Sequence, residues 1–256
     1  MTTAPARSAQ PSAAAPARST PPPAAAAAGA KVAEYRFKLP ADATEMFIVR
    51  HGASADAVPG EPYPFRGGWS DPELSPVGRE QAERIADRLL HELIAAIYVS
   101  NLRRTHQSAA PLAERLGLTP IEEPDLREAL MGEWEGFLWR QRIEEGHPLA
   151  LRMIDEQRWD IIPGAEDPGD FATRVRTALA RIADRHRGET VAIFTHGGVI
   201  GQAVGDAVGA QPFPFNASDN GAIAQLVRTA TRWKVRRFND TTHLHPRFTL
   251  APEPLT

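Results

Sequence analysis

The sequence predicts an α/β fold with three layers, in which a mainly parallel sheet carries helices on both faces. Short apolar runs at 46–49, 95–99 and 191–194 have the unbroken hydrophobicity of strands that are buried on both sides. A helical pattern follows each of these runs along the chain. Strands and helices that alternate in this way form parallel sheets, because each helix returns the chain across one face of the sheet.

The first helix is expected to begin at Ser75, with the serine as N-cap and Pro76 in the first turn. The preceding segment 53–70 is rich in Gly, Pro and aromatic residues and is expected to be a loop. The second helix follows the strand at 95–99 and ends before Gly117. The apolar face of the first helix is expected to consist of Ile85, Leu89, Leu90 and Leu93.

A further helix is expected after Asp170, which we assign as its N-cap. The strand at 191–194 then leads through His196 into an apolar helix, and residues 222–238 predict a closing pair of strands. The apolar face of the helix after Asp170 is expected to consist of Phe171, Val175, Ala178, Leu179 and Ile182.

We expect a single domain over residues 41–246, between a disordered Ala/Pro-rich tail (1–40) and a short C-terminal tail (247–256). The start of the chain is dominated by Ala, Pro, Ser and Thr, and its prolines prevent a continuous helix. Its longest apolar run, 24–28, is too short for the core of a signal peptide or for a membrane span.

The composition excludes several classes of site and partner. The chain has 256 residues, no cysteine and a net charge of −3. Without cysteine there is no disulfide, no thiolate metal site and no cysteine nucleophile. A near-neutral charge argues against binding of nucleic acid, which usually requires a basic face. We therefore expect a cytoplasmic protein that binds neither nucleic acid nor membrane, and the sequence gives no indication of its oligomeric state.

Polar segments follow the predicted strands at 50–52, 100–104 and 196–198. A fourth segment, 126–128, leads to a Gly- and Trp-containing stretch at 132–136. The carboxyl ends of parallel strands meet at one edge of a sheet, where such folds place their ligands. Two histidines, two or three arginines and a carboxylate are therefore expected to come together at that edge.

This set of side chains matches what cleavage of a phosphomonoester without a metal requires. A neutral imidazole is not repelled by the phosphoryl dianion and can form a phosphohistidine. Arginines bind the phosphoryl oxygens, and a second, protonated histidine adds positive charge. A carboxylic acid can protonate the leaving alkoxide and then activate water. Glycines beside the histidines, such as Gly197, are expected to let the backbone approach the phosphate.

Arg50-His51-Gly52, directly after an apolar strand, resembles the RHG signature of the histidine phosphatase (phosphoglycerate mutase-like) superfamily. Further motifs that resemble the family follow in the expected order over about residues 45–245: Ser100-x-Leu102-x-Arg104, Leu126-x-Glu128, Gly132-x-Trp134-Glu135-Gly136, His196-Gly197-Gly198 and Asn220-Gly221. The resemblance implies the phosphoglycerate mutase-like fold and a reaction that needs no metal or organic cofactor.

Position by position, the resemblance implies that His51 is the nucleophile and that Arg50, Arg104 and His196 bind the phosphoryl group. Glu128 matches the proton donor of the family, and His196 is counted among the catalytic residues. We expect structural roles for the neighbouring glutamates at 133 and 135. His243 and His245 lack a third ligand at useful spacing, so no metal site is expected.

We therefore expect a phosphoric monoester hydrolase that acts on a small organic or sugar phosphate through a phosphohistidine. The alternative is a cofactor-dependent phosphoglycerate mutase. Members of that branch carry a longer insertion between the segments matching Gly136 and His196, with adjacent arginines that grip the carboxylate of the substrate, and no Arg-Arg pair occurs there in this chain. A third possibility is a non-catalytic module that binds a phosphometabolite or phosphoprotein. Residues 53–68 and 137–165 either shape the mouth of the pocket or form a small packed flap.

Overall fold

The computed structural model describes residue 1 and residues 38–57, 63–136 and 138–245. From Leu39 onward the described residues form one compact unit. The predicted tails, 1–40 and 247–256, lie almost entirely outside the described residues, so both remain predictions.

A six-stranded sheet with the order β5-β4-β6-β1-β7-β8 forms the centre of this unit. The first four strands in this order are parallel, β7 runs antiparallel to β1, and β8 runs antiparallel to β7. The sheet confirms the predicted fold class, and β7 and β8 are the expected closing pair. The strands are β1 (Thr44–Arg50), β4 (Ile94–Val99), β5 (Ile121–Glu122), β6 (Thr190–Thr195), β7 (Ile223–Arg228) and β8 (Trp233–Asp240).

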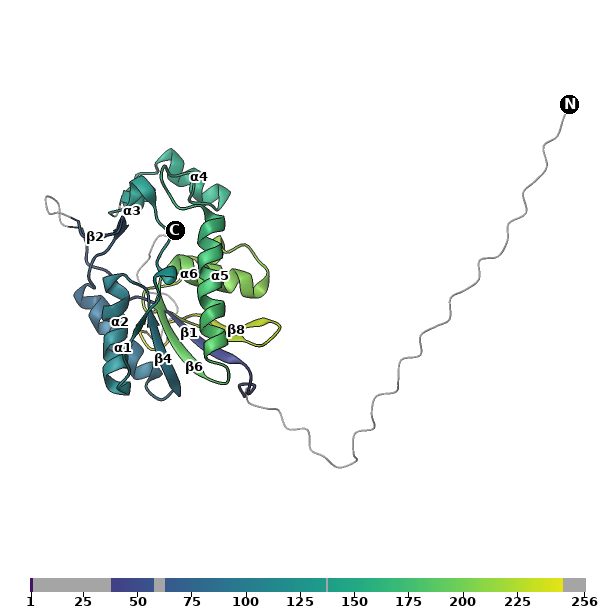
Figure 1. Ribbon diagram of the computed structural model, residues 1–256. Coiled ribbons are helices and arrows are strands. Elements are labelled where there is room, and N and C mark those ends of the chain that lie inside the picture. Colours follow the sequence, from purple (N-terminus) through teal and green to yellow (C-terminus); the bar gives the residue numbers. More distant parts are fainter. Residues whose placement is uncertain (2–37, 58–62, 137, 246–256) are drawn as a thin grey trace. The chain divides into compact units, whose positions relative to one another are not determined.

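Helices cover both faces of the sheet (Figure 1). Those of one face are α1 (Pro76–Leu89) and α2 (Arg103–Leu116), and those packed on the core of the other are α3 (Leu138–Glu144), α4 (Pro148–Glu156), α5 (Pro168–Arg185) and α6 (Gly197–Val208). Short elements in the connections are the hairpin β2 (Phe65–Arg66) and β3 (Trp69–Ser70), and the 3₁₀ helices η1 (Pro124–Leu126), η2 (Gly132–Trp134) and η3 (Phe213–Phe215).

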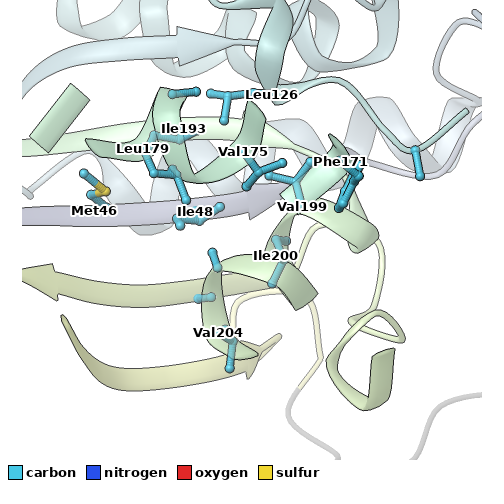
Figure 2. Close-up of a cluster of buried hydrophobic side chains, with 14 of the residues drawn as sticks. Met46, Ile48, Leu126, Phe171, Val175, Leu179, Ile193, Val199, Ile200 and Val204 are labelled. Atoms are coloured by element: carbon cyan, nitrogen blue, oxygen red, sulfur yellow. The ribbon is translucent and has the colours of Figure 1, made fainter. Parts of the chain in front are cut away.

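Alternation along the strands divides the apolar core into two clusters. Phe47 and Val49 of β1 pack with α1 and α2, whereas Met46 and Ile48 point to the other face. Figure 2 shows the second cluster, in which the apolar faces of α5 and α6 lie against the strands. All five predicted apolar positions of α5 are buried. Burial of each large aliphatic side chain stabilises the fold by roughly 1.5–3 kcal/mol.

Two predicted helix ends are confirmed, whereas the end of the first helix and the loop before that helix differ from the prediction. Ser75 caps α1, accepting a hydrogen bond from the Gly78 amide at 3.1 Å. Helix α2 ends at Gly117, whose left-handed φ of 64° favours glycine. Helix α1, however, stops at Leu89, and Leu93 is exposed. The expected loop 53–70 also contains the β2–β3 hairpin.

Helix α5 is capped by Asp167 rather than by Asp170. The Asp167 carboxylate accepts hydrogen bonds from the amides of Gly169 (2.7 Å) and Asp170 (3.1 Å). Pro168 occupies the first helical position, where the missing N–H is not needed. This proline places the start of the helix three residues earlier than we predicted.

The parallel strands bring three polar segments to one edge of the sheet. Strand β6 lies between β4 and β1, and these strands lead into His196, Ser100 and His51 respectively. In Figure 1, α3 and α4 lie beyond the end of the sheet opposite to the one where β1 begins. No helix in the described part of the chain is long and apolar enough to span a membrane.

Candidate active site

His51 sits immediately after β1 with its ring held in a defined orientation. Its side chain is buried, with 8% of the residue's surface exposed. The ring Nδ1 lies 2.7 Å from the carbonyl oxygen of Gly52, so Nδ1 carries the proton and donates it to this oxygen. The other nitrogen, Nε2, therefore carries the lone pair. A second contact fixes the backbone of His51, because the side-chain amide of Asn220 donates a hydrogen bond to the His51 carbonyl at 3.1 Å.

His196 lies at the N-terminus of α6 and is fully buried. Its Nε2 lies 2.9 Å from the Ser100 hydroxyl, whereas no described residue provides a partner for its buried Nδ1. When Ser100 donates to Nε2, the proton of the neutral ring is on Nδ1. A buried N–H without an acceptor costs about 1–3 kcal/mol, so Nδ1 is a candidate donor to a bound ligand.

The two histidine rings face each other edge to face, with centroids 5.2 Å apart. Burial lowers the pKa of both rings well below the usual value of 6.5, and the nearby positive charge of Arg104 lowers it further. His51 is therefore neutral at neutral pH, which its predicted role as nucleophile requires. The lowered pKa of His196 opposes the expected protonation of this second histidine.

Arg104 and Arg50 provide positive charge beside the histidines. Arg104 lies in the first turn of α2 and is 93% buried, since only 7% of its surface is exposed. Its guanidinium donates to the carbonyl of Ser70 at 2.8 Å. Arg50 donates to the carbonyl of Ser218. The neighbouring Arg103 is exposed, so only Arg104 of the two adjacent arginines lies in the buried site.

Glu128 reaches this site from the segment after η1. One carboxylate oxygen accepts a hydrogen bond from the Gly198 amide at 3.2 Å, and the other accepts one from the Ala129 amide at 3.0 Å. The first contact places the carboxylate at the N-terminus of α6, two residues from His196. All five predicted side chains therefore lie around the same edge of the sheet.

The glycines of the motifs serve close packing within the protein. A Cβ on Gly198 would collide with the carboxylate of Glu128, and one on Gly197 would collide with the backbone of Asn216. A Cβ on Gly52 would collide with the backbone of Gly78 in α1. These contacts show that the glycines admit neighbouring elements of the protein. The expected approach of a phosphate to the backbone at Gly197 stays a prediction.

Several other sequence interpretations are resolved by the contacts. Glu135 has the predicted structural role, because its carboxylate accepts hydrogen bonds from the backbone of Ser70 and Met131. His243 lies 3.1 Å from the Gly221 carbonyl, which also fits a structural role. His186 is buried against the hydroxyl of Tyr98. Within the described ranges, no three His, Asp or Glu side chains are grouped so that they could hold a metal ion.

The sequence patterns assign no role to two residues that bind site residues through hydrogen bonds, Ser100 and Arg174. Ser100 orients His196, although it stands within a motif that we used only as a family signal. Arg174 of α5 donates to the carbonyl of Glu128 at 2.9 Å. A usable signal existed for Arg174, because it shares the apolar face of its helix with Phe171 and Ala178 at helical spacing.

Known proteins resemble this chain in sequence and fold. Residues 46–241 match the family model of the histidine phosphatase superfamily, branch 1. Phosphoglycerate mutase-like protein 4 of Arabidopsis thaliana is 36% identical over 163 residues, which are 62% of this chain and 69% of that protein. The metal-independent phosphoserine phosphatase of the same plant is 35% identical over 167 residues, 64% of this chain and 68% of its own length.

Solved structures support the same assignment. A mycobacterial glucosyl-3-phosphoglycerate phosphatase superposes with a TM-score of 0.62 at 26% identity, covering 78% of this chain and 100% of its own. A phosphoglycerate mutase from Bacillus anthracis shares the fold with a TM-score of 0.64 at 18% identity, covering 80% of this chain and 96% of its own. The predicted enzyme class, a phosphoric monoester hydrolase, agrees with these relatives. The chain belongs to the histidine phosphatase superfamily, branch 1.

Proposed function

We propose that this protein is a metal-independent phosphomonoesterase that transfers the phosphoryl group of a small organic or sugar phosphate to His51. The observation that carries the proposal is the state of His51. Its Nδ1 is bound to the Gly52 carbonyl, and burial together with Arg104 and Arg50 lowers its pKa, so that the ring is neutral with Nε2 as the nucleophilic atom.

In the first half-reaction, His51 Nε2 attacks phosphorus and forms an N–P bond while the ester P–O bond breaks. Arg50 and Arg104 bind the phosphoryl oxygens and hold phosphorus in line. The unpartnered Nδ1 of His196 donates to a third oxygen. Glu128, in its protonated form, gives its proton to the departing alkoxide, which leaves as an alcohol.

In the second half-reaction, water hydrolyses the phosphohistidine. The Glu128 carboxylate takes a proton from the water as the oxygen attacks phosphorus, and the N–P bond breaks. Inorganic phosphate leaves, His51 returns to its neutral form, and Glu128 is again protonated for the next turnover. The positive charges of Arg104 and Arg50 lower the pKa of His196. The negative charge of a bound phosphate dianion opposes them, so the pKa of His196 rises when phosphate is bound.

Relatives guide the choice of substrates to test. Two of them are named for phosphoserine and for glucosyl-3-phosphoglycerate. Both names describe small organic phosphates that also carry a carboxylate. We propose a substrate of this kind, with the phosphoryl group bound by the residues at the strand ends and the remainder directed toward α3 and α4.

The mutase alternative rests on relatives that bear that name, such as the 36% identical plant protein. A mutase must keep the carboxylate of its substrate and a second phosphate bound for as long as the phosphohistidine persists. Three arginines between residues 138 and 160 are already paired with nearby acids: Arg142 with Glu145, Arg152 with Glu156 and Arg158 with Asp160. This pairing favours release of the dephosphorylated product and entry of water.

The function is tested by a panel of phosphomonoesters in the presence of EDTA, including phosphoserine, glucosyl-3-phosphoglycerate and common sugar phosphates. We expect phosphate release that EDTA does not reduce. In a parallel reaction with 3-phosphoglycerate and catalytic 2,3-bisphosphoglycerate, phosphorus NMR should show inorganic phosphate forming faster than 2-phosphoglycerate. Faster isomerisation would establish the mutase, and activity that needs a metal would refute the proposed mechanism.

A further inference from the structure

Arg174 is an arginine on the inner face of α5, and only 11% of its side chain is exposed. Its guanidinium lies over the ring of Phe171, 4.6 Å from the ring centroid. An arginine buried to this degree needs acceptors for all five of its N–H groups, because each one left unpaired would be destabilising.

Five hydrogen bonds from Arg174 account for these five N–H groups. Nε and Nη2 donate to the two carboxylate oxygens of Glu166, at 2.6 and 2.7 Å. Nη1 donates to the carbonyls of Asp125 and Arg127, both at 2.8 Å. Nη2 also donates to the carbonyl of Glu128 at 2.9 Å. Three of the five acceptors thus belong to the segment 125–128.

Two other side chains bind the remaining carbonyl, that of Leu126, and the carbonyl of Glu128 a second time. The Thr195 hydroxyl, at the end of β6, donates to the Leu126 carbonyl at 2.7 Å. The indole N–H of Trp69 donates to the Glu128 carbonyl at 3.0 Å. Every backbone carbonyl from 125 to 128 therefore accepts a hydrogen bond from a side chain, and the segment is held by α5, β6 and the β2–β3 hairpin together.

Glu166 binds the guanidinium of Arg174 and also contacts the backbone of Leu130. Its carboxylate accepts from the Leu130 amide at 3.2 Å, and its own amide donates to the Leu130 carbonyl at 2.9 Å. Only 14% of its side chain is exposed. The ion pair between Glu166 and Arg174 is thus shielded from water and bidentate, a geometry that lysine cannot reproduce.

The carboxylate of Glu128 depends on this backbone for its position. It accepts hydrogen bonds from the amides of Gly198 and Ala129, and no side chain in the described part of the protein donates to it. Its place at the N-terminus of α6 is therefore set by where the segment 125–128 holds its Cα. Proton transfer requires a heavy-atom distance of about 2.6–3.2 Å, so a small shift of the segment would disturb it.

We propose that Arg174, with Glu166, is a positioning residue that holds Glu128 at proton-transfer distance from the leaving oxygen. The inference rests on the proposed role of Glu128 as the proton donor. The proposal links α5 to the proton donor through Arg174, whose hydrogen bonds go to Glu166 and to the segment 125–128 and not to His51.

The test compares kcat/KM for an alkyl phosphate, whose alkoxide must be protonated as it leaves, with kcat/KM for p-nitrophenyl phosphate, whose phenolate leaves without help. Arg174→Lys should lower kcat/KM for the alkyl substrate by about 10–100-fold, as expected for partial loss of general acid catalysis, and that for p-nitrophenyl phosphate by less than about three-fold. Arg176→Lys is the matched control, since Arg176 lies on the same helix in an exposed bidentate pair with Asp206. It should change neither value.

A double-mutant cycle with Glu128→Gln decides whether Arg174 acts through Glu128. In the Glu128→Gln background, Arg174→Lys should have less than about a two-fold further effect on the alkyl substrate. Equal losses on the two substrates, or additive losses in the cycle, would overturn the proposal and leave Arg174 a purely structural residue. If Arg174→Lys does not fold, Glu166→Gln tests the same ion pair with the same expected results.

Failure of the inference is distinguishable from failure of the proposed function. If Glu128→Gln discriminates between the two substrates and Arg174→Lys does not, only the positioning role is wrong. If Glu128→Gln itself lowers both values equally, Glu128 is not the proton donor, and the positioning role is overturned with it.

Discussion

The strand-end pocket and the α3–α4 cap of this protein differ in burial and in how their polar groups are paired. We define the pocket by His51, Arg104 and His196, and the cap by residues 138–156. The three pocket residues expose 0–8% of their surface. Helix α3, by contrast, has no buried residue, and two arginine–glutamate pairs of the cap lie at the surface.

We expect this difference to separate the chemistry from the choice of substrate. The pocket is built on strand ends fixed by the sheet, where buried charges and oriented rings act strongly on a bound phosphoryl group. The cap consists of the short helices α3 and α4, and several of its side chains are exposed, including Leu151 and Ile154. Substitutions in the pocket should therefore strongly lower activity on any phosphomonoester, whereas substitutions in the cap should have little effect on activity toward a minimal substrate.

The largest effect is expected for His51→Ala. Removal of the nucleophile should lower kcat for p-nitrophenyl phosphate by about 10⁴-fold or more, because no other group can form the covalent intermediate. His91→Ala, at an exposed position, is the control and should retain full activity. Circular dichroism should show both variants folded. Substantial activity in a folded His51→Ala variant would place the nucleophile elsewhere.

A smaller loss is expected for Arg104→Gln. Loss of one charged donor to the phosphoryl oxygens should lower kcat/KM by about 10²–10³-fold. Its neighbour provides the control: Arg103→Gln removes an exposed guanidinium and should remain within about two-fold of the native enzyme. Similar losses in both variants, measured on the same substrate, would mean that burial does not separate the two arginines functionally.

The pH dependence of kcat/KM tests the electrostatics of the pocket. His51 must be neutral to attack, and its pKa is lowered, so activity should persist as pH falls through 6.5 and decline only well below that value. Arg140 of the cap contributes less to this shift than Arg104. Arg140→Gln should therefore move the acid limb upward, but by less than Arg104→Gln. An acid limb at or above 6.5 in the native enzyme would contradict the account.

The same pKa shift predicts the direction of a change in stability. Below pH 6.5 the unfolded chain binds protons at positions 51 and 196 while the folded protein still excludes them. The free energy of unfolding should therefore decrease as pH falls from about 6.5 toward the lowered pKa values. Urea unfolding at a series of pH values would measure this decrease, and constant stability over that range would contradict it.

The smallest effects are expected in the cap. Arg152→Gln removes an exposed i,i+4 pair with Glu156 and should leave the free energy of unfolding nearly unchanged, because water screens exposed ion pairs. Activity on p-nitrophenyl phosphate should stay within about two-fold. Urea unfolding and steady-state kinetics measure the two quantities. A loss comparable to that of Arg104→Gln would remove the distinction between pocket and cap.

The predictable part of the molecule is the part whose signals are local in sequence. The apolar strand runs, and the polar segments that follow them, predict that His51, Arg104 and His196 lie at one edge of the sheet. Contacts between distant segments were not accessible in this way. His186 is buried because Tyr98, 88 residues away, packs on it, and Arg174 binds a segment more than 40 residues earlier in the chain.

Local ambiguity explains the remaining differences. Two aspartates, Asp167 and Asp170, lie three residues apart, and only the intervening proline indicates which one caps α5. Leu93 continues the apolar spacing of α1, yet the helix has already ended at Leu89. Periodicity alone does not show where a helix stops when no glycine or proline marks its end.

The most direct test of the account is the site of phosphorylation on the enzyme. Glu128→Gln should slow hydrolysis of the intermediate, so that it accumulates with p-nitrophenyl phosphate and survives denaturation in alkali. Tandem mass spectrometry should locate the phosphoryl group on His51, and phosphorus NMR should assign it to Nε2, because Nδ1 is bound to the Gly52 carbonyl. A phosphoryl group on Nδ1 or on another residue, or a burst of product with no phosphoenzyme, would contradict the mechanism.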